Sequence, residues 1–234
     1  TTIDLVLNVV KEPSRITSVP SSAEVTVGGP FSVTGIITQN DGATPLGISG
    51  NIEVILTSPL GIPRSIQGTF DSLTGTYNIG SESFCGLFDE AGTWQVHAKW
   101  DGDANYQGAV SPMTEILVSK ASSSVVMDVS IQNIKFGNPA TISGKFTPDP
   151  NCGTDLGGLP MLLEITEPDL DPTDNVQPVV HEIEIATWAQ ANVNNDGQFS
   201  YDHVFDKLGT WEIKTRFLGT DGYAYSSSEK AYVN

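Results

Sequence analysis

Three clusters of Asp and Asn side chains have the spacing of oxygen ligands for a hard cation. Each cluster places its oxygen-bearing residues at alternate or nearly alternate positions, and the second resembles the opening of a calcium loop. Their members are Asp101, Asp103 and Asn105; Asn192, Asn194 and Asp196; and Asp169, Asp171 and Asp174. Because Ca²⁺ takes about six to eight oxygen ligands, three from one loop are insufficient. The residues therefore either serve hairpin turns or contribute to a Ca²⁺ site.

Two aromatic residues are candidates for contact with a ligand. Trp188 falls on the face of an alternating stretch opposite its apolar residues, and an exposed Trp can stack on a sugar or anchor a protein contact. The alternative is that the strand bulges or ends there and that Trp188 packs locally. Tyr225 lies beside a turn with Tyr223 and would extend the contact surface.

Catalysis has little support in this sequence. The three histidines, His97, His181 and His203, lie in strand-like stretches, and neither cysteine has a histidine nearby in the chain. No Gly-x-Ser-x-Gly elbow, phosphate-binding loop or His-Glu-x-x-His motif occurs. We therefore expect a protein that is not an enzyme.

Composition excludes several other classes of protein. The 234 residues carry a formal net charge of −17, with 11 Lys and Arg against 28 Asp and Glu, which argues against nonspecific binding of nucleic acid. No apolar run approaches the roughly 18 residues of a membrane helix, so no membrane span is expected. Strand-like stretches and only 17% charged residues argue against disorder. The chain shows no signal peptide and looks like a mature or excised fragment. Its acidic balance fits either a secreted or surface protein or a salty environment.

The elements that would position these residues occur twice. Residues 29–35 align with residues 138–144 at an offset of 109, so that Gly35 falls over Gly144. Later in the chain, Gly-Thr-Trp at 92–94 aligns with Gly-Thr-Trp at 209–211 at an offset of 117. Several matching blocks in one order indicate a tandem repeat.

Alternation within each copy predicts strands with one buried face. In the first copy the apolar face is formed by Trp94, Val96, Ala98 and Trp100, and in the second by Trp211, Ile213, Thr215 and Phe217. The residues between them are mostly polar or charged and are expected to face outward. About seven such short strands in about 110 residues predict a two-sheet antiparallel sandwich. The fold class is therefore all-β, with two tandem sandwich domains.

Three of these motifs also carry a resemblance to a known family. Gly-x-Pro-x-x-Val/Ile-x-Gly, Gly-Thr-Trp and the following Gly-Asp-x-x-Tyr at 102–106 resemble bacterial and archaeal immunoglobulin-like (Big-type) repeats. The second copy departs from the last motif, with Gly-Thr-Asp-Gly-Tyr at 219–223. The resemblance implies immunoglobulin-like domains of large extracellular adhesins, surface-layer proteins or spacers of secreted enzymes.

Domain boundaries follow from the repeat. We expect the first domain at 11–119 and the second at 120–234. Residues 1–10 contain alternating apolar Ile3, Leu5 and Leu7 and resemble the last strand of a preceding repeat. This strand either pairs with the first domain or completes a neighbouring unit.

The two cysteines lie in loops that should meet where the domains join. By sandwich topology, the loop of Cys85 faces the end at which the chain leaves the first domain, and the loop of Cys152 faces the end at which it enters the second. A Cys85–Cys152 disulfide would then stabilise the chain by about 4 kcal/mol and stiffen the junction. The alternative is two separate thiols. A cation site at the same junction would use residues from the following set: Asp89, Glu90, Asp149 and Asp155.

The function predicted from these features is structural. We expect a non-enzymatic structural or adhesive segment of an extracellular cell-surface or surface-layer protein, acting as a repeat spacer or assembly unit. Its partners would be neighbouring repeats or copies of the same protein, with Ca²⁺ as the candidate cofactor. The alternative is a ligand-binding module of a secreted enzyme, directed at carbohydrate such as surface glycans.

Overall fold

The structure is a computed structural model of the chain. It describes residues 9–45, 47–84, 86–151, 155–171, 173, 176–188 and 197–234. The chain divides into two compact units, Thr1–Ser119 and Lys120–Asn234. Among the described residues there is no helix with the length and apolar character needed to cross a bilayer.

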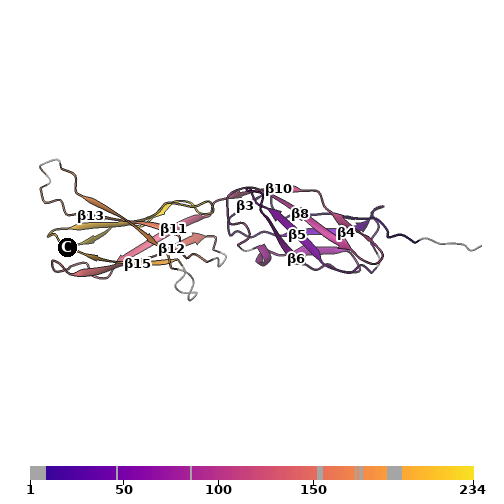
Figure 1. The fold of residues 1–234 in the computed structure, drawn as a ribbon, viewed down its shortest axis with the longest axis horizontal. Helices are drawn as coiled ribbons and strands as arrows, with labels where there is room; N and C mark the ends of the chain where they lie inside the picture. The colour runs from indigo at the N-terminus through magenta and orange to yellow at the C-terminus, as the bar shows by residue number, and fades with distance from the viewer. Residues whose placement is uncertain are drawn as a thin grey trace, which may run out of the picture. The chain divides into compact units, whose positions relative to one another are not determined.

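Two sheets form the first unit (Figure 1). In the smaller sheet, β4 is central and pairs antiparallel with the other three strands. Its strands are β1 (Ser14–Ile16), β2 (Val19–Pro20), β4 (Val33–Gln39) and β7 (Thr76–Ile79). The larger sheet consists of β3 (Glu24–Thr26), β10 (Thr114–Ser119), β8 (Gly92–Gly102), β5 (Ile52–Thr57) and β6 (Pro63–Gly68), with β9 (Gln107–Val110) also paired to β8. A 3₁₀ helix, η1 (Ser81–Phe84), precedes β8. The one parallel pair among these strands joins β3 to β10.

The second unit also consists of two sheets, and the strands of both are paired antiparallel. The smaller sheet contains β11 (Ser122–Val129), β12 (Pro139–Asp149) and β15 (Gln198–Val204), in that order. The larger sheet contains β14 (Val180–Ala186), β13 (Pro160–Thr166) and β16 (Trp211–Phe217), and β16 also pairs with β17 (Ser226–Ser227) and β18 (Ala231–Val233). The all-β sandwich architecture predicted from the alternation of the sequence is therefore confirmed.

The predicted apolar faces of β8 and β16 form the centre of each core. Along β8 the four alternating residues from Trp94 to Trp100 are at most 1% exposed, and along β16 those from Trp211 to Phe217 are at most 2% exposed. Burying an aliphatic or aromatic side chain of this size contributes about 1.5–3 kcal/mol relative to leaving it in water. These two strands therefore hold the two layers of each sandwich together.

The tryptophan that opens each of these strands makes the same hydrogen bond in both units. The indole N–H of Trp94 donates to the carbonyl oxygen of Glu90 at 3.0 Å, and that of Trp211 donates to the carbonyl oxygen of Lys207 at 3.1 Å. In each case the acceptor lies four residues before the tryptophan. A buried indole N–H needs such a partner, so the loop before the strand must fold back toward the ring.

The aromatic neighbour of each tryptophan is also repeated. The ring of Phe88 lies 5.2 Å from that of Trp94, with an angle of 82° between the ring planes. The ring of Phe205 lies 5.3 Å from that of Trp211, with an angle of 83°. Both pairs have the edge-to-face geometry that aromatic quadrupoles favour. The two tryptophans thus have like surroundings, which the tandem repeat predicts.

The repeated glycine of each copy is required because an aromatic ring on the neighbouring strand of the sheet packs against it. A Cβ atom at Gly35 would overlap the carbonyl oxygen of Thr17 and the ring of Tyr77, and one at Gly144 would overlap the ring of Phe199. The Tyr77 hydroxyl donates to the Thr17 oxygen at 2.5 Å, and burial raises the pKa of Tyr77 to about 12. Only glycine leaves room for the ring to lie against the strand backbone.

The apolar stretch at the start of the chain is described only in part. Ile3, Leu5 and Leu7 lie outside the described residues, so the strand expected there stays a prediction. Val9 and Val10 are 83% and 77% exposed.

This packing gives a stability prediction with a matched control. We expect Gly35→Ala to destabilise the first unit, and Gly144→Ala the second, by about 1–3 kcal/mol, because the added methyl group forces backbone and ring apart. Gly80→Ala is the control, since a Cβ at that position meets no atom within 4 Å. Equilibrium denaturation, with amide hydrogen exchange to report which unit is affected, measures the change. Equal effects of all three substitutions would contradict the explanation.

Candidate functional site

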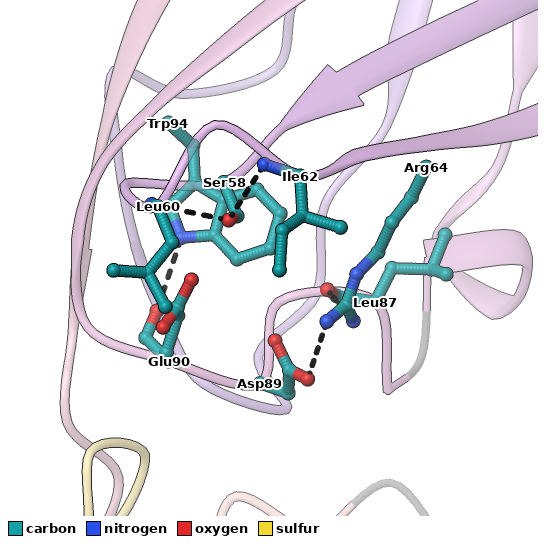
Figure 2. Close-up of polar contacts among 8 residues, drawn as sticks. All are labelled: Ser58, Leu60, Ile62, Arg64, Leu87, Asp89, Glu90 and Trp94. Atoms are coloured by element: carbon teal, nitrogen blue, oxygen red, sulfur yellow. Dashed lines mark hydrogen bonds and ion pairs between the residues drawn. The ribbon is translucent and has the colours of Figure 1, made fainter.

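A tight turn between β5 and β6 exposes two apolar side chains to solvent (Figure 2). The buried Ser58 hydroxyl accepts hydrogen bonds from the backbone N–H of Leu60 at 3.2 Å and of Ile62 at 3.4 Å. The backbone N–H of Ser58 donates to the carbonyl oxygen of Ile62 at 3.0 Å. Leu60 and Ile62 are 75% and 53% exposed. The turn is thus well ordered by its polar groups and presents an apolar tip.

Beside this turn, an arginine ties the edge strand β6 to the loop before β8 (Figure 2). The Arg64 guanidinium donates to the carbonyl oxygen of Leu87 at 2.9 Å and pairs with the carboxylate of Asp89 at 2.6 Å. Its central carbon lies 5.5 Å from the centre of the Trp94 ring, within the range of a cation–π contact. Arg64 therefore covers the buried tryptophan and closes this corner of the sandwich.

The second unit has a histidine at the position of this arginine. Leu56 of β5 pairs with Arg64, and Ile165 of β13 pairs with His181. Leu56 and Ile165 are matching positions of the repeat. The two units therefore have the same strand pairing at this corner but a different ionisable residue, Arg64 in the first and His181 in the second.

The charges around this histidine differ from those around the arginine. The His181 Nε2 atom lies 2.9 Å from one carboxylate oxygen of Glu167, and the Lys207 ammonium pairs with the other oxygen. The Glu167 side chain is 12% exposed. Hydrogen bonds from Lys207 and then from His181 lower the pKa of Glu167. The corner in each unit is closed by an ion pair, but the two ion pairs have no residue type in common.

The carboxylate of Asp103, in the first candidate calcium motif, binds backbone N–H groups. It accepts hydrogen bonds from the N–H groups of Asn105 at 2.8 Å, Tyr106 at 2.9 Å and Ser49 at 3.0 Å. Partial desolvation raises the pKa of Asp103, but these three donors outweigh it and leave the pKa below its ordinary value. The side chain thus joins the loop before β5 to the turn after β8.

The other members of the acidic clusters fall into two groups. Asp101 pairs with Lys99 at 2.8 Å, and Asp171 donates its backbone N–H to the Asp169 carboxylate at 3.1 Å, as in a turn. The remaining members lie outside the described residues: Asp174, Asn192, Asn194 and Asp196. Within the described part of the chain, no group of three or more His, Cys, Asp and Glu side chains is placed to hold a metal ion. A Ca²⁺ site at the second motif stays a prediction.

The predicted disulfide falls on residues for which no placement is described. Cys85 and Cys152 both lie outside the described ranges, so their pairing stays a prediction. The acidic residues near them have local partners, since Asp89 binds Arg64 and the Asp155 carboxylate accepts the N–H of Gly157 at 2.9 Å.

Both aromatic candidates present their rings to water in part. Trp188 is 46% exposed and Tyr225 is 55% exposed. On β14, Ile183 and Ile185 pack against the core, as their spacing predicts. The same alternation predicts that Val179 and His181 also point inward, but Val179 is 52% exposed and the His181 side chain is 45% exposed. The face that packs against the core is therefore limited to the later part of β14.

The three histidines are placed as parts of the sandwich. His203 packs against Phe205 at 4.8 Å and against Trp211 at 5.6 Å between ring centres. Desolvation, and then the charge of His181, lower the pKa of His203. His97 lies on the outward side of β8, and His181 pairs with Glu167. His181 and His203 thus make contacts within the sandwich, whereas the buried His97 Nδ1 and His203 Nε2 atoms have no hydrogen-bond partner among the described residues.

One repeated polar pair was missed by the sequence reasoning. The buried hydroxyls of Ser111 and Ser228 accept the N–H of Ala98 at 2.9 Å and of Thr215 at 3.0 Å, respectively. Each hydroxyl also donates to the carbonyl oxygen of the next residue. The offset of 117 that aligns Gly-Thr-Trp also aligns these serines, so extending that alignment would have found them.

No protein-family model matches this sequence, and no curated protein matches it either. Similar folds do occur among solved structures. The crystal structure of invasin, a bacterial integrin-binding protein, has a TM-score of 0.50 at 13% identity and covers 94% of this chain and 38% of its own. The Yersinia pseudotuberculosis adhesin InvE has a TM-score of 0.41 at 14% identity, over 94% of this chain and 58% of its own. The fibronectin(III)-like modules of Clostridium thermocellum CbhA have a TM-score of 0.29 at 12% identity, over 93% and 91%.

At these identities the likeness concerns the fold. The chain adopts immunoglobulin-like β-sandwich domains and spans less than two thirds of the invasin and InvE chains with which it aligns.

The hydrogen bonds of Asp103 predict a pH-dependent contribution to stability. Because its pKa is lowered on folding, the contribution is present above its ordinary pKa and is lost as the pH falls through the lowered value. We expect Asp103→Ala to destabilise the first unit by about 0.5–2 kcal/mol near neutral pH, as for loss of a capping side chain. Asp101→Ala is the control, since an exposed ion pair contributes about 0–1 kcal/mol. Thermal unfolding as a function of pH measures both, and a difference that persists unchanged in acid would contradict the assignment.

Proposed function

We propose that this chain is a structural and adhesive segment of an extracellular surface protein, in which Big-type immunoglobulin-like repeats act as spacers and assembly units. One observation carries the proposal: the two units repeat the contacts that build the fold and differ in the ionisable groups around that core. Trp94 and Trp211 keep their hydrogen bond, while Arg64 is replaced by His181. A duplicated catalytic site would be expected to repeat its polar atoms.

In a spacer, tension is applied at the residue where the chain enters each unit. In both units, this residue forms hydrogen bonds through its N–H and through its carbonyl oxygen. The N–H of Glu12 donates to Asn105 and its carbonyl oxygen accepts from Gln107, both at 2.9 Å. In the second unit, the N–H of Ala121 donates to Gly222 at 2.9 Å and its carbonyl oxygen accepts from Ala224 at 2.8 Å. These contacts fix the entering chain to the segment that follows β8 or β16.

The last strand of the first unit is held in a geometry that resists tension. The N–H of Leu117 donates to Ala23 and the N–H of Val27 donates to Ser119, both at 2.9 Å, on either side of the parallel pair of β3 and β10. Pulling the two ends of the unit slides these parallel strands past each other. Their hydrogen bonds are then strained together rather than one at a time, which favours a high unfolding force.

A similar contact occurs at the last residue of the second unit. The N–H of Ile134 donates to the carbonyl oxygen of Asn234, and the N–H of Asn234 donates to that of Gln132, both at 2.8 Å. Both units thus pair the segment after their first strand with their last strand. The formal charge of −17 would keep neighbouring chains apart, so that assembly depends on specific contacts.

Single-molecule stretching of the 234-residue chain tests the spacer role. We expect two unfolding events, and we expect Leu117→Pro to lower the force of one of them, because proline removes the N–H that binds Ala23. Leu117 is 51% exposed, so the loss of its side chain costs little burial. The second unit is the internal control and should unfold at an unchanged force. Weak unfolding of both units in the unmodified chain would count against a mechanical role.

A further inference from the structure

Thr187, the residue directly after β14 in the larger sheet of the second unit, is held by several hydrogen bonds. Thr187 is 3% exposed, and its hydroxyl donates to the carbonyl oxygen of Leu156 and accepts the N–H of Leu159 at 2.9 Å. Its backbone N–H donates to Leu159 at 3.1 Å, and its carbonyl oxygen accepts from Gly158 at 2.8 Å. Four hydrogen bonds therefore fix the backbone immediately before Trp188.

Trp188 is itself held by its backbone, while its ring remains half in water. Its N–H donates to the carbonyl oxygen of Gln198, the first residue of β15, at 2.6 Å. Its side chain is 46% exposed, whereas Trp94, Trp100 and Trp211 are at most 2% exposed. The rigid backbone means that a ligand meeting this ring would cause little further loss of backbone conformational entropy.

The first unit shows that the fold does not need a tryptophan here. The N–H of Asp71 donates to Thr76, the first residue of β7, at 2.9 Å, just as Trp188 donates to Gln198. The Asp71 carboxylate accepts the N–H of Leu73 at 2.8 Å, as a turn residue does. The same backbone contact thus carries a turn-forming aspartate in one copy and an exposed tryptophan in the other.

A hollow of about 340 Å³ lies beside Trp188 on the outward face of β11, β12 and β15. Two rows of cross-strand neighbours flank it: Val126, Lys145 and Gln198 in one row, and Asp128, Ser143 and Ser200 in the other. The row between them is Met127, Gly144 and Phe199, of which Met127 and Phe199 pack against the core. The lining therefore combines the outward side chains of the two rows with the middle row and Trp188.

We propose that this hollow binds a pyranose sugar of a glycan. A pyranose ring has an apolar C–H face, which suits the indole of Trp188, and a rim of hydroxyls, which suits the ammonium of Lys145 and the hydroxyls of Ser143 and Ser200. The volume lies at the lower end of the range for small-molecule sites, roughly 300–1,000 Å³. This binding activity goes beyond the spacer role and belongs to the second unit alone, since the first unit has Asp71 in place of Trp188.

Binding of the intact 234-residue chain to an array of pyranose-containing oligosaccharides is the first test. The strongest oligosaccharide is then titrated against the chain while indole fluorescence is recorded, since the other three tryptophans are buried and Trp188 should dominate the change. We expect Trp188→Ala to weaken binding by about tenfold or more and Lys145→Ala to weaken it by a smaller factor. Tyr225→Ala is the matched control, because Tyr225 is 55% exposed but lies outside the hollow, and it should bind as the unmodified chain does.

A second variant keeps the test decisive if Trp188→Ala lowers the stability of the unit. Ser143→Leu leaves the tryptophan in place and fills the hollow from the row of Ser143, so it should abolish binding. The proposal is overturned if no oligosaccharide on the array binds, if Ser143→Leu binds normally, or if Tyr225→Ala alone loses binding. None of these results bears on the unfolding forces, so failure here is distinguishable from failure of the spacer role.

Discussion

The indole N–H of the repeated tryptophan is the constraint on which each unit depends. A tryptophan at the first core position of the central strand buries a large apolar surface, but its N–H cannot be left without an acceptor. The acceptor is a backbone carbonyl four residues earlier, on Glu90 or Lys207. The preceding loop must therefore turn back over the core, and this brings Phe88 or Phe205 edge-on to the indole. One polar atom thus constrains the path of this loop.

The two units share this constraint but differ in other contacts. Ser111 and Ser228 make the same two hydrogen bonds, whereas the second unit has Phe199 at the position of Tyr77 and therefore lacks its hydroxyl contact. The first strand of the fold has also diverged. In the first unit it is interrupted between β1 and β2, both of which pair with β4, while β11 stays paired with β12 over eight residues. The tryptophan and serine contacts of the core are therefore shared, whereas the Tyr77 hydroxyl contact and the pairing of the first strand differ between the units.

Much of this architecture was predictable because it follows from local pattern. Alternation along Trp94–Trp100 indicates which face is buried, and the two offsets indicate that the arrangement occurs twice. The site residues were less accessible, because they depend on strand register. Arg64 covers Trp94 only because β6 pairs with β5 in one register, and Thr187 fixes Trp188 only through a distant loop. The exposure of Trp188 itself was foreseen as one of two possibilities, since the period of two places it opposite Ile183 and Ile185.

The glycine that faces an aromatic ring has a consequence for recognising relatives of this protein. Gly35 and Tyr77, like Gly144 and Phe199, are far apart in the sequence, and the number of intervening residues differs between the copies. A search with fixed spacing would miss such a pair. Because a side chain on one strand and a ring on the next cannot occupy the same space, the two positions should vary together in any further copy. Covariation between them would identify a divergent member even where the tryptophan motif has been lost.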